Sequence, residues 1–137
     1  MSDCIFCKIA KGELPAVKVY EDEKFLAFLD LHPVSVGHTL VVPKDHFVNI
    51  LDTPEEVLSG LMAVVKKISP AILKVANVPS FNLGVNNGVA AGQIIEHTHF
   101  HIIPRLADDG LRNWPSRQGY EPGVMEKVGE EIKKQIK

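Results

Sequence analysis

Three of the six histidines lie close together, at alternate positions of the heptapeptide His-Thr-His-Phe-His-Ile-Ile that starts at residue 97. The residues between them are β-branched or aromatic, which favours a strand. Alternate side chains of a strand point to one face, so His97, His99 and His101 are expected to form an imidazole row. Histidine acts as nucleophile, acid, base or metal ligand near neutral pH. The row predicts a catalytic or metal-binding surface, and a purely structural row of exposed histidines is the alternative.

Both cysteines lie near the start of the chain, in the run Cys4-Ile-Phe-Cys7. This spacing is typical of a metal knuckle or a redox pair. No strand precedes the run, as a thioredoxin-like pair would require, so metal ligation is favoured over redox chemistry or two inert thiols. Zinc prefers four tetrahedral ligands. Because the outer histidines of a straight strand lie about 13 Å apart, the three cannot share one ion, and the two histidine ligands stay open at this point.

The loop before the histidine row is rich in residues that tolerate positive φ. Asn86, Gly88, Gly92 and Gln93 can place backbone N–H groups and amides around an anion. A phosphate held beside imidazoles is open to nucleophilic attack by histidine at phosphorus. Ordinary turn chemistry is the alternative for the loop alone.

Other candidate residues lie earlier in the chain. Asp30 follows an apolar run and could accept hydrogen bonds from a ribose diol, although a turn carboxylate is the alternative interpretation. Phe6, Ile9 and Phe28 could line an apolar base pocket, or belong to the core.

Composition predicts one domain of ordinary make-up. The chain has 137 residues, of which 45% are hydrophobic and 23% charged. A net charge of −2 gives no basic field, so no nucleic-acid partner is expected. We find neither a signal-peptide pattern nor a long apolar segment, so we expect no membrane contact and a cytoplasmic location.

The hydrophobic pattern alternates between strand and helix periods. Thr53 and Pro54 predict a helix start, with Thr53 as N-cap, and Pro70 should kink or break that helix. The predicted elements are a helical turn over 4–11, a hairpin of 17–21 and 25–30, a buried strand 39–42, a helix from 53 to 77, a strand 81–85, the histidine strand ending at Pro104, and a helix 124–136. Strands joined without long crossovers predict an α+β domain with a mostly antiparallel sheet.

Several segments together resemble one known family, the histidine triad (HIT) superfamily of nucleotide hydrolases and transferases. The resemblance covers residues 3–105 of a single domain over 1–137, and the tail 106–137 is less diagnostic. It rests on the segments Cys4 to Ile9, Phe28 to Asp30, Gly37 to Lys44, Asn86 to Gln93, His97 to Ile103, and Pro104-Arg105.

The resemblance implies a HIT-like α+β fold with a five-stranded, mostly antiparallel sheet, one long central helix and a C-terminal helix, in a homodimer. It implies a purine nucleotide substrate, either a nucleoside phosphoramidate or a dinucleoside polyphosphate. Cleavage at the α-phosphate would pass through a nucleotidyl-histidine intermediate. The alternatives are a nucleotide-binding regulatory or scaffold protein with incidental hydrolysis, and a hydrolase that uses zinc for catalysis.

By this resemblance His99 is the nucleophile, His101 assists the leaving group and His38 orients the site. Neutral His99 needs an acceptor on its other ring nitrogen, and a backbone carbonyl is expected there. The resemblance also assigns Asp30 to the ribose, and it implies structural zinc. The phosphate-loop residues are Asn86, Gly92 and Gln93, the base-pocket residues are Ile5, Phe6, Ile9, Phe28 and Leu31, and the zinc ligands are Cys4, Cys7, His46 and His97. Ile94 is a departure, because some members place a hydroxyl residue there.

Overall fold

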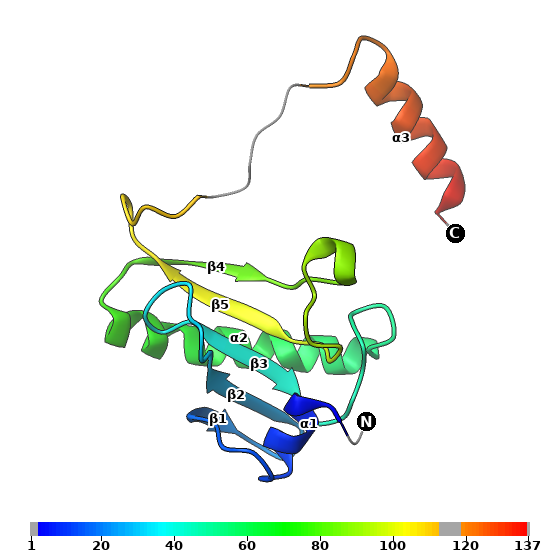
Figure 1. Ribbon diagram of the computed structural model, residues 1–137. Coiled ribbons are helices and arrows are strands. Elements are labelled where there is room, and N and C mark those ends of the chain that lie inside the picture. Colours follow the sequence, from blue (N-terminus) through cyan, green and yellow to red (C-terminus); the bar gives the residue numbers. More distant parts are fainter. Residues whose placement is uncertain (1–2, 113–118, 137) are drawn as a thin grey trace.

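Five strands form one antiparallel sheet in the computed structural model, which describes residues 3–112 and 119–136 (Figure 1). The strand order is β1-β2-β3-β5-β4. The strands are β1 (Lys18–Glu21), β2 (Phe25–Leu29), β3 (Thr39–Pro43), β4 (Ser80–Gly84) and β5 (Phe100–Arg105). The helices are α1 (Ile5–Ala10), α2 (Glu55–Ala76) and α3 (Val124–Gln135), with a 3-10 turn η1 (Val89–Ala91). The predicted α+β fold with a five-stranded sheet, a long helix and a C-terminal helix is confirmed.

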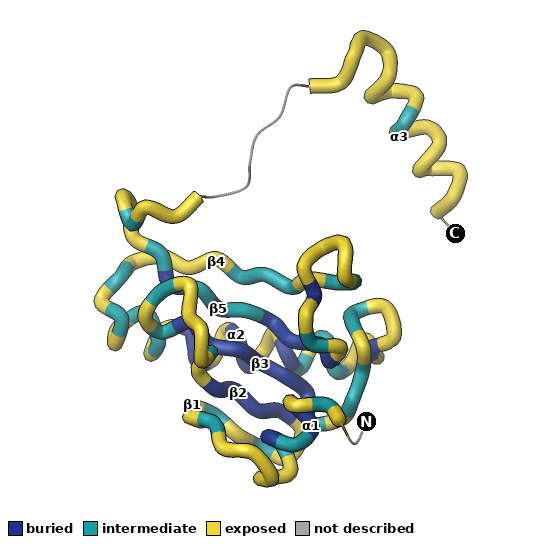
Figure 2. The backbone as a smooth tube through the Cα atoms, in the orientation of Figure 1, coloured by how far each residue is buried: buried dark blue, intermediate teal, exposed yellow. Residues whose placement is uncertain are grey.

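The alternation of side chains along the strands divides the core between the two faces of the sheet. On one face, Ala27, Val41 and Ile102 pack with the apolar stripe of α2, which runs along the sheet in Figure 1. On the other face, Phe28 and Leu40 pack with residues of the short helix α1. β3 is buried along its whole length, as predicted, and Figure 2 shows it in the darkest part of the sheet. Within the described residues, no helix is long and apolar enough to cross a membrane.

Two predictions about α2 are wrong. The helix continues through Pro70 to Ala76 without a break. Pro70 has no N–H to donate to the carbonyl of Lys66, four residues earlier in the helix. Both residues are exposed, so water can replace the missing hydrogen bond. Thr53 is not the N-cap, because Pro54 takes that position, and the Thr53 hydroxyl instead donates to the Asn49 carbonyl at 2.6 Å.

The histidine strand both begins and ends later in the chain than predicted. β5 begins at Phe100 and includes Pro104, so only His101 of the triad lies within the regular strand. The carbonyl of Pro104 accepts a hydrogen bond from the Ser35 hydroxyl at 2.7 Å. The backbone nitrogen and the carbonyl of a strand residue point to the same side of the strand, so the nitrogen of Pro104 also points toward Ser35. On that side β5 pairs with β3 only as far as Ile102. Pro104 therefore lies beyond the paired part of β5, where its missing N–H leaves no sheet hydrogen bond unmade.

We predict that Gly60→Ala lowers the free energy of unfolding by about 1–3 kcal/mol, because α2 passes close to an aromatic ring at this residue. An added Cβ at Gly60 would lie 2.2 Å from Cζ of Phe25. Gly129→Ala is the matched control, since it lies on α3 with no atom within 4 Å of the added Cβ. Alanine raises helix propensity at both positions. Equal denaturation midpoints of the two variants would contradict the predicted clash.

Candidate active site and metal centre

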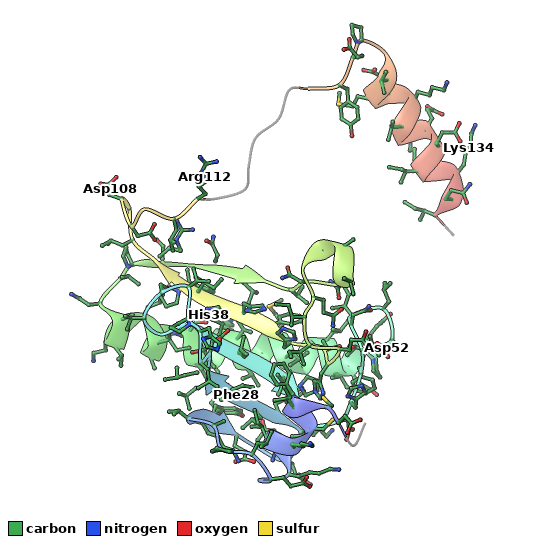
Figure 3. All side chains as sticks on the ribbon, in the orientation of Figure 1. Phe28, His38, Asp52, Asp108, Arg112 and Lys134 are labelled. Atoms are coloured by element: carbon green, nitrogen blue, oxygen red, sulfur yellow. The ribbon has the colours of Figure 1, made fainter. Side chains whose placement is uncertain are left out.

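Three histidines and a carboxylate converge on the sheet face that α2 leaves open. His38 comes just before β3 and His101 lies in β5, and their Nε2 and Nδ1 atoms are 2.9 Å apart. The rings of His99 and His101 have centroids 4.9 Å apart. Asp30, after β2, places Oδ2 3.6 Å from Nε2 of His38. Figure 3 labels His38 above the strands. The topology thus joins groups from three strand ends in one site.

The backbone fixes which ring nitrogen of His38 carries its proton. The N–H of Val34 donates to Nδ1 of His38 at 3.0 Å, so neutral His38 has its proton on Nε2. That Nε2–H donates to Nδ1 of His101, which leaves the proton of neutral His101 on its own Nε2. Asp30, His38 and His101 are close enough to hold a cation. Because Nε2 of His38 bears a proton rather than a free lone pair, we interpret them as a hydrogen-bonded chain.

His99 is held in the opposite tautomer. Its Nδ1 lies 2.6 Å from the carbonyl oxygen of His97. A carbonyl only accepts, so Nδ1 of His99 donates its proton and Nε2 keeps a free lone pair. The ring of Phe6 contacts His99 edge-on, with centroids 5.1 Å apart. A backbone carbonyl partner is the arrangement expected from the sequence.

Burial keeps these imidazoles uncharged at neutral pH. Desolvation lowers the pKa of His38 and of His99, and backbone or carboxylate partners only partly oppose it. The pKa of His101 falls to about 4, mainly through burial and then through the neighbouring His99 and His38. Neutral rings supply a free lone pair, which a nucleophile requires, and N–H groups that can donate hydrogen bonds to a phosphate or a leaving group.

We predict that His101 makes the folded protein less stable in weak acid. Its pKa is about 4 in the folded chain and about 6.5 when unfolded. Between these values the unfolded chain binds more protons, so the free energy of unfolding falls as pH falls. The loss begins below pH ~6.5 and reaches up to about 1.4 kcal/mol per pH unit from this residue. Urea denaturation from pH 7 to 5 should show a shallower pH slope for His101→Gln, and identical slopes would contradict the prediction.

Four further side chains converge beside this site, from three segments. Cys4 and Cys7 belong to the start of α1, His46 follows β3, and His97 precedes β5. Nδ1 of His97 lies 3.3 Å from Sγ of Cys4, 3.6 Å from Sγ of Cys7 and 3.2 Å from Nδ1 of His46. A tetrahedral zinc ion requires N···N separations of about 3.4 Å and S···N separations of about 3.6 Å. The four ligand atoms therefore have the spacing of a zinc site.

The tautomer of His97 also suits metal binding. Its Nε2 lies 2.8 Å from the carbonyl oxygen of Pro43, so Nε2 donates and Nδ1 turns a lone pair toward the cysteines. Such an outer partner is typical of metal-bound histidine. Burial raises the pKa of the Cys7 thiol, so a cation is needed to hold it as thiolate at neutral pH. Residues and geometry both fit zinc.

The loop over 86–93 has the glycines that its shape requires, but Gln93 turns inward. Gly88 and Gly92 have φ of +94° and +95°, and Asn86 lies against Gly92. The Gln93 amide donates to the carbonyls of Val48 and Ile95 and accepts from Gly88 N–H. Gln93 therefore braces the loop, and its side chain has no free donor to offer a phosphate. Ile94, the departure from the family pattern, is 88% exposed.

The apolar candidates separate into core and surface. Phe6, Ile9 and Phe28 are buried together in one cluster. Ile5 is 47% exposed and Leu31 is 87% exposed, so these two are open to a ligand. Asp30 does have its turn role, because Oδ1 accepts from His32 N–H at 2.8 Å.

Sequence reasoning missed two groups that orient the histidines. They are the N–H of Val34, which binds His38, and the carbonyl of Pro43, which binds His97. Both are backbone groups, which nearly every residue type carries, so no side-chain pattern could have indicated them.

Comparison with known proteins identifies the class. Residues 11–108 match the HIT domain, and the chain belongs to this histidine triad family. Adenosine 5'-monophosphoramidase hnt1 of Schizosaccharomyces pombe is 42% identical over 136 residues, 98% of each chain. Adenylylsulfatase HINT3 of Arabidopsis thaliana is 50% identical over 115 residues, 84% of this chain, and the match spans only 57% of that protein.

Solved structures agree with the fold. The crystal structure of SMU.412c from Streptococcus mutans covers 100% of this chain and 87% of its own, at 39% identity and a TM-score of 0.93. A zinc-bound histidine triad family protein from Mycobacterium smegmatis covers 85% of each chain, at 40% identity and a TM-score of 0.78. These similarities show that the fold of this chain is known from crystal structures.

Proposed function

We propose that this protein is a hydrolase or transferase that cleaves nucleotides at the α-phosphate through a nucleotidyl intermediate on His99. One observation carries the proposal. The carbonyl of His97 binds Nδ1–H of His99, which leaves the Nε2 lone pair of a neutral, buried imidazole beside His101. This is the state that nucleophilic catalysis by histidine requires.

In the proposed first step, Nε2 of His99 attacks the α-phosphorus while the bond from phosphorus to the leaving nitrogen or oxygen breaks. Nε2–H of His101 donates a hydrogen bond to the leaving group and so assists its protonation, for which the proton comes from solvent, and His38 Nε2–H holds the His101 ring in place through Nδ1. In the second step, water attacks phosphorus and the P–N bond to His99 breaks. The attacking water gives up its proton to solvent, and a nucleoside monophosphate is released.

The substrate we propose is a purine nucleoside phosphoramidate, with a dinucleoside polyphosphate as the second possibility. The names of two relatives, adenosine 5'-monophosphoramidase and adenylylsulfatase, support an adenylyl group. We propose that Asp30 binds the ribose and that Asn86, Gly92 and the braced Gln93 loop surround the phosphate. The base would lie against Ile5 and Leu31, with Phe6, Ile9 and Phe28 beneath them.

We also propose that Cys4, Cys7, His46 and His97 bind a structural zinc ion. The converging ligand atoms and a zinc-bound relative support this assignment. Four protein ligands leave no open coordination position, which argues against catalytic zinc. A homodimer and a cytoplasmic location complete the proposal.

A kinetic panel tests the substrate class. Adenosine and guanosine phosphoramidates and dinucleoside polyphosphates would be assayed at equal concentrations, with zinc content measured on the same sample. We expect kcat/KM to be highest for a phosphoramidate. Uniformly negligible turnover, with tight and selective monophosphate binding, would instead support the scaffold alternative.

A further inference from the structure

The loop proposed to surround the phosphate contains two neighbouring asparagines with different surroundings. Asn86 is exposed, and its side chain lies against Gly92. Asn87 is half-buried, and its Oδ1 accepts a hydrogen bond from the N–H of Ile50 at 2.9 Å. Asn86 is therefore open to a ligand, whereas the side-chain oxygen of Asn87 is already bound to another part of the chain.

The partner of Asn87 lies in the irregular segment 44–54, which connects β3 to α2. Asp52, labelled in Figure 3, shapes this segment, because its carboxylate accepts from the N–H groups of Val48 at 3.1 Å and Asn49 at 3.0 Å. The side chain of Ile50 packs against the core cluster that includes the buried face of α2. The segment is thus fixed to the domain and can support the loop over 86–93.

Two side chains attach the loop over 86–93 to this support, one near each end of the loop. Near its start, Asn87 binds the N–H of Ile50. At its end, the Gln93 amide donates to the carbonyl of Val48 at 2.6 Å. Figure 1 shows the loop and its support at the same end of the sheet. Removal of the Asn87 contact therefore releases one end of the loop from its support.

Phosphate binding needs this loop in one conformation. Asn86 and Gly92, which we propose to surround the phosphate, come from its two ends and meet where the loop closes. If only a fraction of the molecules holds that conformation, the apparent affinity falls by the same fraction. We propose that Asn87 is a positioning residue for the phosphate group, which holds the loop on the segment 44–54 without touching the ligand. This role rests on the nucleotide site proposed above.

Two other roles for Asn87 would give different results. A purely stabilising hydrogen bond would contribute to the free energy of unfolding, and its loss would leave the ratio of affinities for phosphorylated and unphosphorylated ligands unchanged. A direct contact with phosphate would affect that ratio, but its loss would leave the mobility of the loop unchanged. Loss of a positioning residue changes both the ratio and the mobility.

Asn87→Leu tests the proposal, because leucine has no acceptor for the N–H of Ile50. The full-length, zinc-loaded protein would be titrated with adenosine monophosphate and with adenosine. We expect the affinity for adenosine monophosphate to fall about fivefold and that for adenosine to stay within about twofold. NMR would follow amide exchange of Ala91, Gly92 and Gln93, whose N–H groups donate within the loop. These amides should exchange at least about threefold faster in the variant.

Asn49→Leu is the matched control. Oδ1 of Asn49 accepts from the N–H of Leu51 at 2.8 Å, so the same kind of hydrogen bond is lost, but both partners lie within the segment 44–54. We expect the ratio of the two affinities, and amide exchange in the loop, to keep their wild-type values. Equal behaviour of Asn49→Leu and Asn87→Leu would contradict the proposal.

The titrations also separate failure of this role from failure of the nucleotide site. An unchanged affinity ratio in Asn87→Leu, or unchanged exchange of the loop amides, would overturn the positioning role and leave the nucleotide site in place. A wild-type protein that binds adenosine monophosphate no more tightly than adenosine would instead remove the phosphate site itself, and the role of Asn87 with it.

Discussion

Replacement of His99 by asparagine is expected to abolish turnover while nucleotide binding persists. Asparagine has no lone pair on a basic nitrogen, so the proposed covalent step cannot occur. Loss of a nucleophile that acts within a catalytic unit lowers kcat by about 10³-fold or more. Single-turnover assays with adenosine phosphoramidate would measure the loss, and calorimetry with adenosine monophosphate should give a dissociation constant within about threefold of the wild-type value.

The matched control is His32→Asn, because His32 is exposed and takes no part in either cluster. It should retain wild-type kinetics. The covalent intermediate gives an independent readout, since substrate labelled at the α-phosphate should leave acid-labile label on the wild-type chain and none on His99→Asn. Turnover of His99→Asn at the wild-type rate would show that His99 is not the nucleophile.

Most of the fold could be predicted from the sequence, because the spacing of hydrophobic residues depends directly on which side chains are buried. The alternating pattern located all five strands to within a few residues. The errors arose where the chain's surroundings override a local rule. Pro70 lies on the solvent side of α2, where its missing hydrogen bond has little cost. The Thr53 hydroxyl meets Thr98 Oγ1 at 2.8 Å, and this contact across 45 residues competes with the capping role.

For the candidate site, residue types were predictable and proton positions were not. Spacing alone put His97, His99 and His101 on one side of the chain. The spacing could not reveal that the free lone pair is on Nδ1 of His97 but on Nε2 of His99. The Pro43 and His97 carbonyls that decide this belong to the backbone. The role of Gln93 was unpredictable for the same reason. Its side chain braces the loop by donating to the carbonyl of Val48, a backbone group 45 residues away.

Loss of the proposed zinc ligands is expected to have the largest effect on stability. Cys7→Ser and His46→Asn should each lower the zinc content from one ion per chain and lower the free energy of unfolding by at least about 3 kcal/mol. Structural zinc contributes about 10–16 kcal/mol to the folding of zinc-finger peptides. The cluster ties α1 to the segment after β3 and to the segment before β5, so its loss releases the N-terminal end of the domain. Urea denaturation and metal analysis would measure both effects.

The same variants separate structural from catalytic zinc. None of the four ligands belongs to the chain of Asp30, His38 and His101, but the carbonyl of His97 orients His99. We therefore expect chains that remain folded at low temperature to keep activity, with kcat reduced by about tenfold or less. His32→Asn again serves as control and should bind a full zinc ion. Complete loss of activity with folding and nucleotide binding preserved would mean that the metal takes part in the reaction. Unchanged stability after chelation of the wild-type protein would contradict a structural role, because an ion that binds only the folded chain must stabilise it.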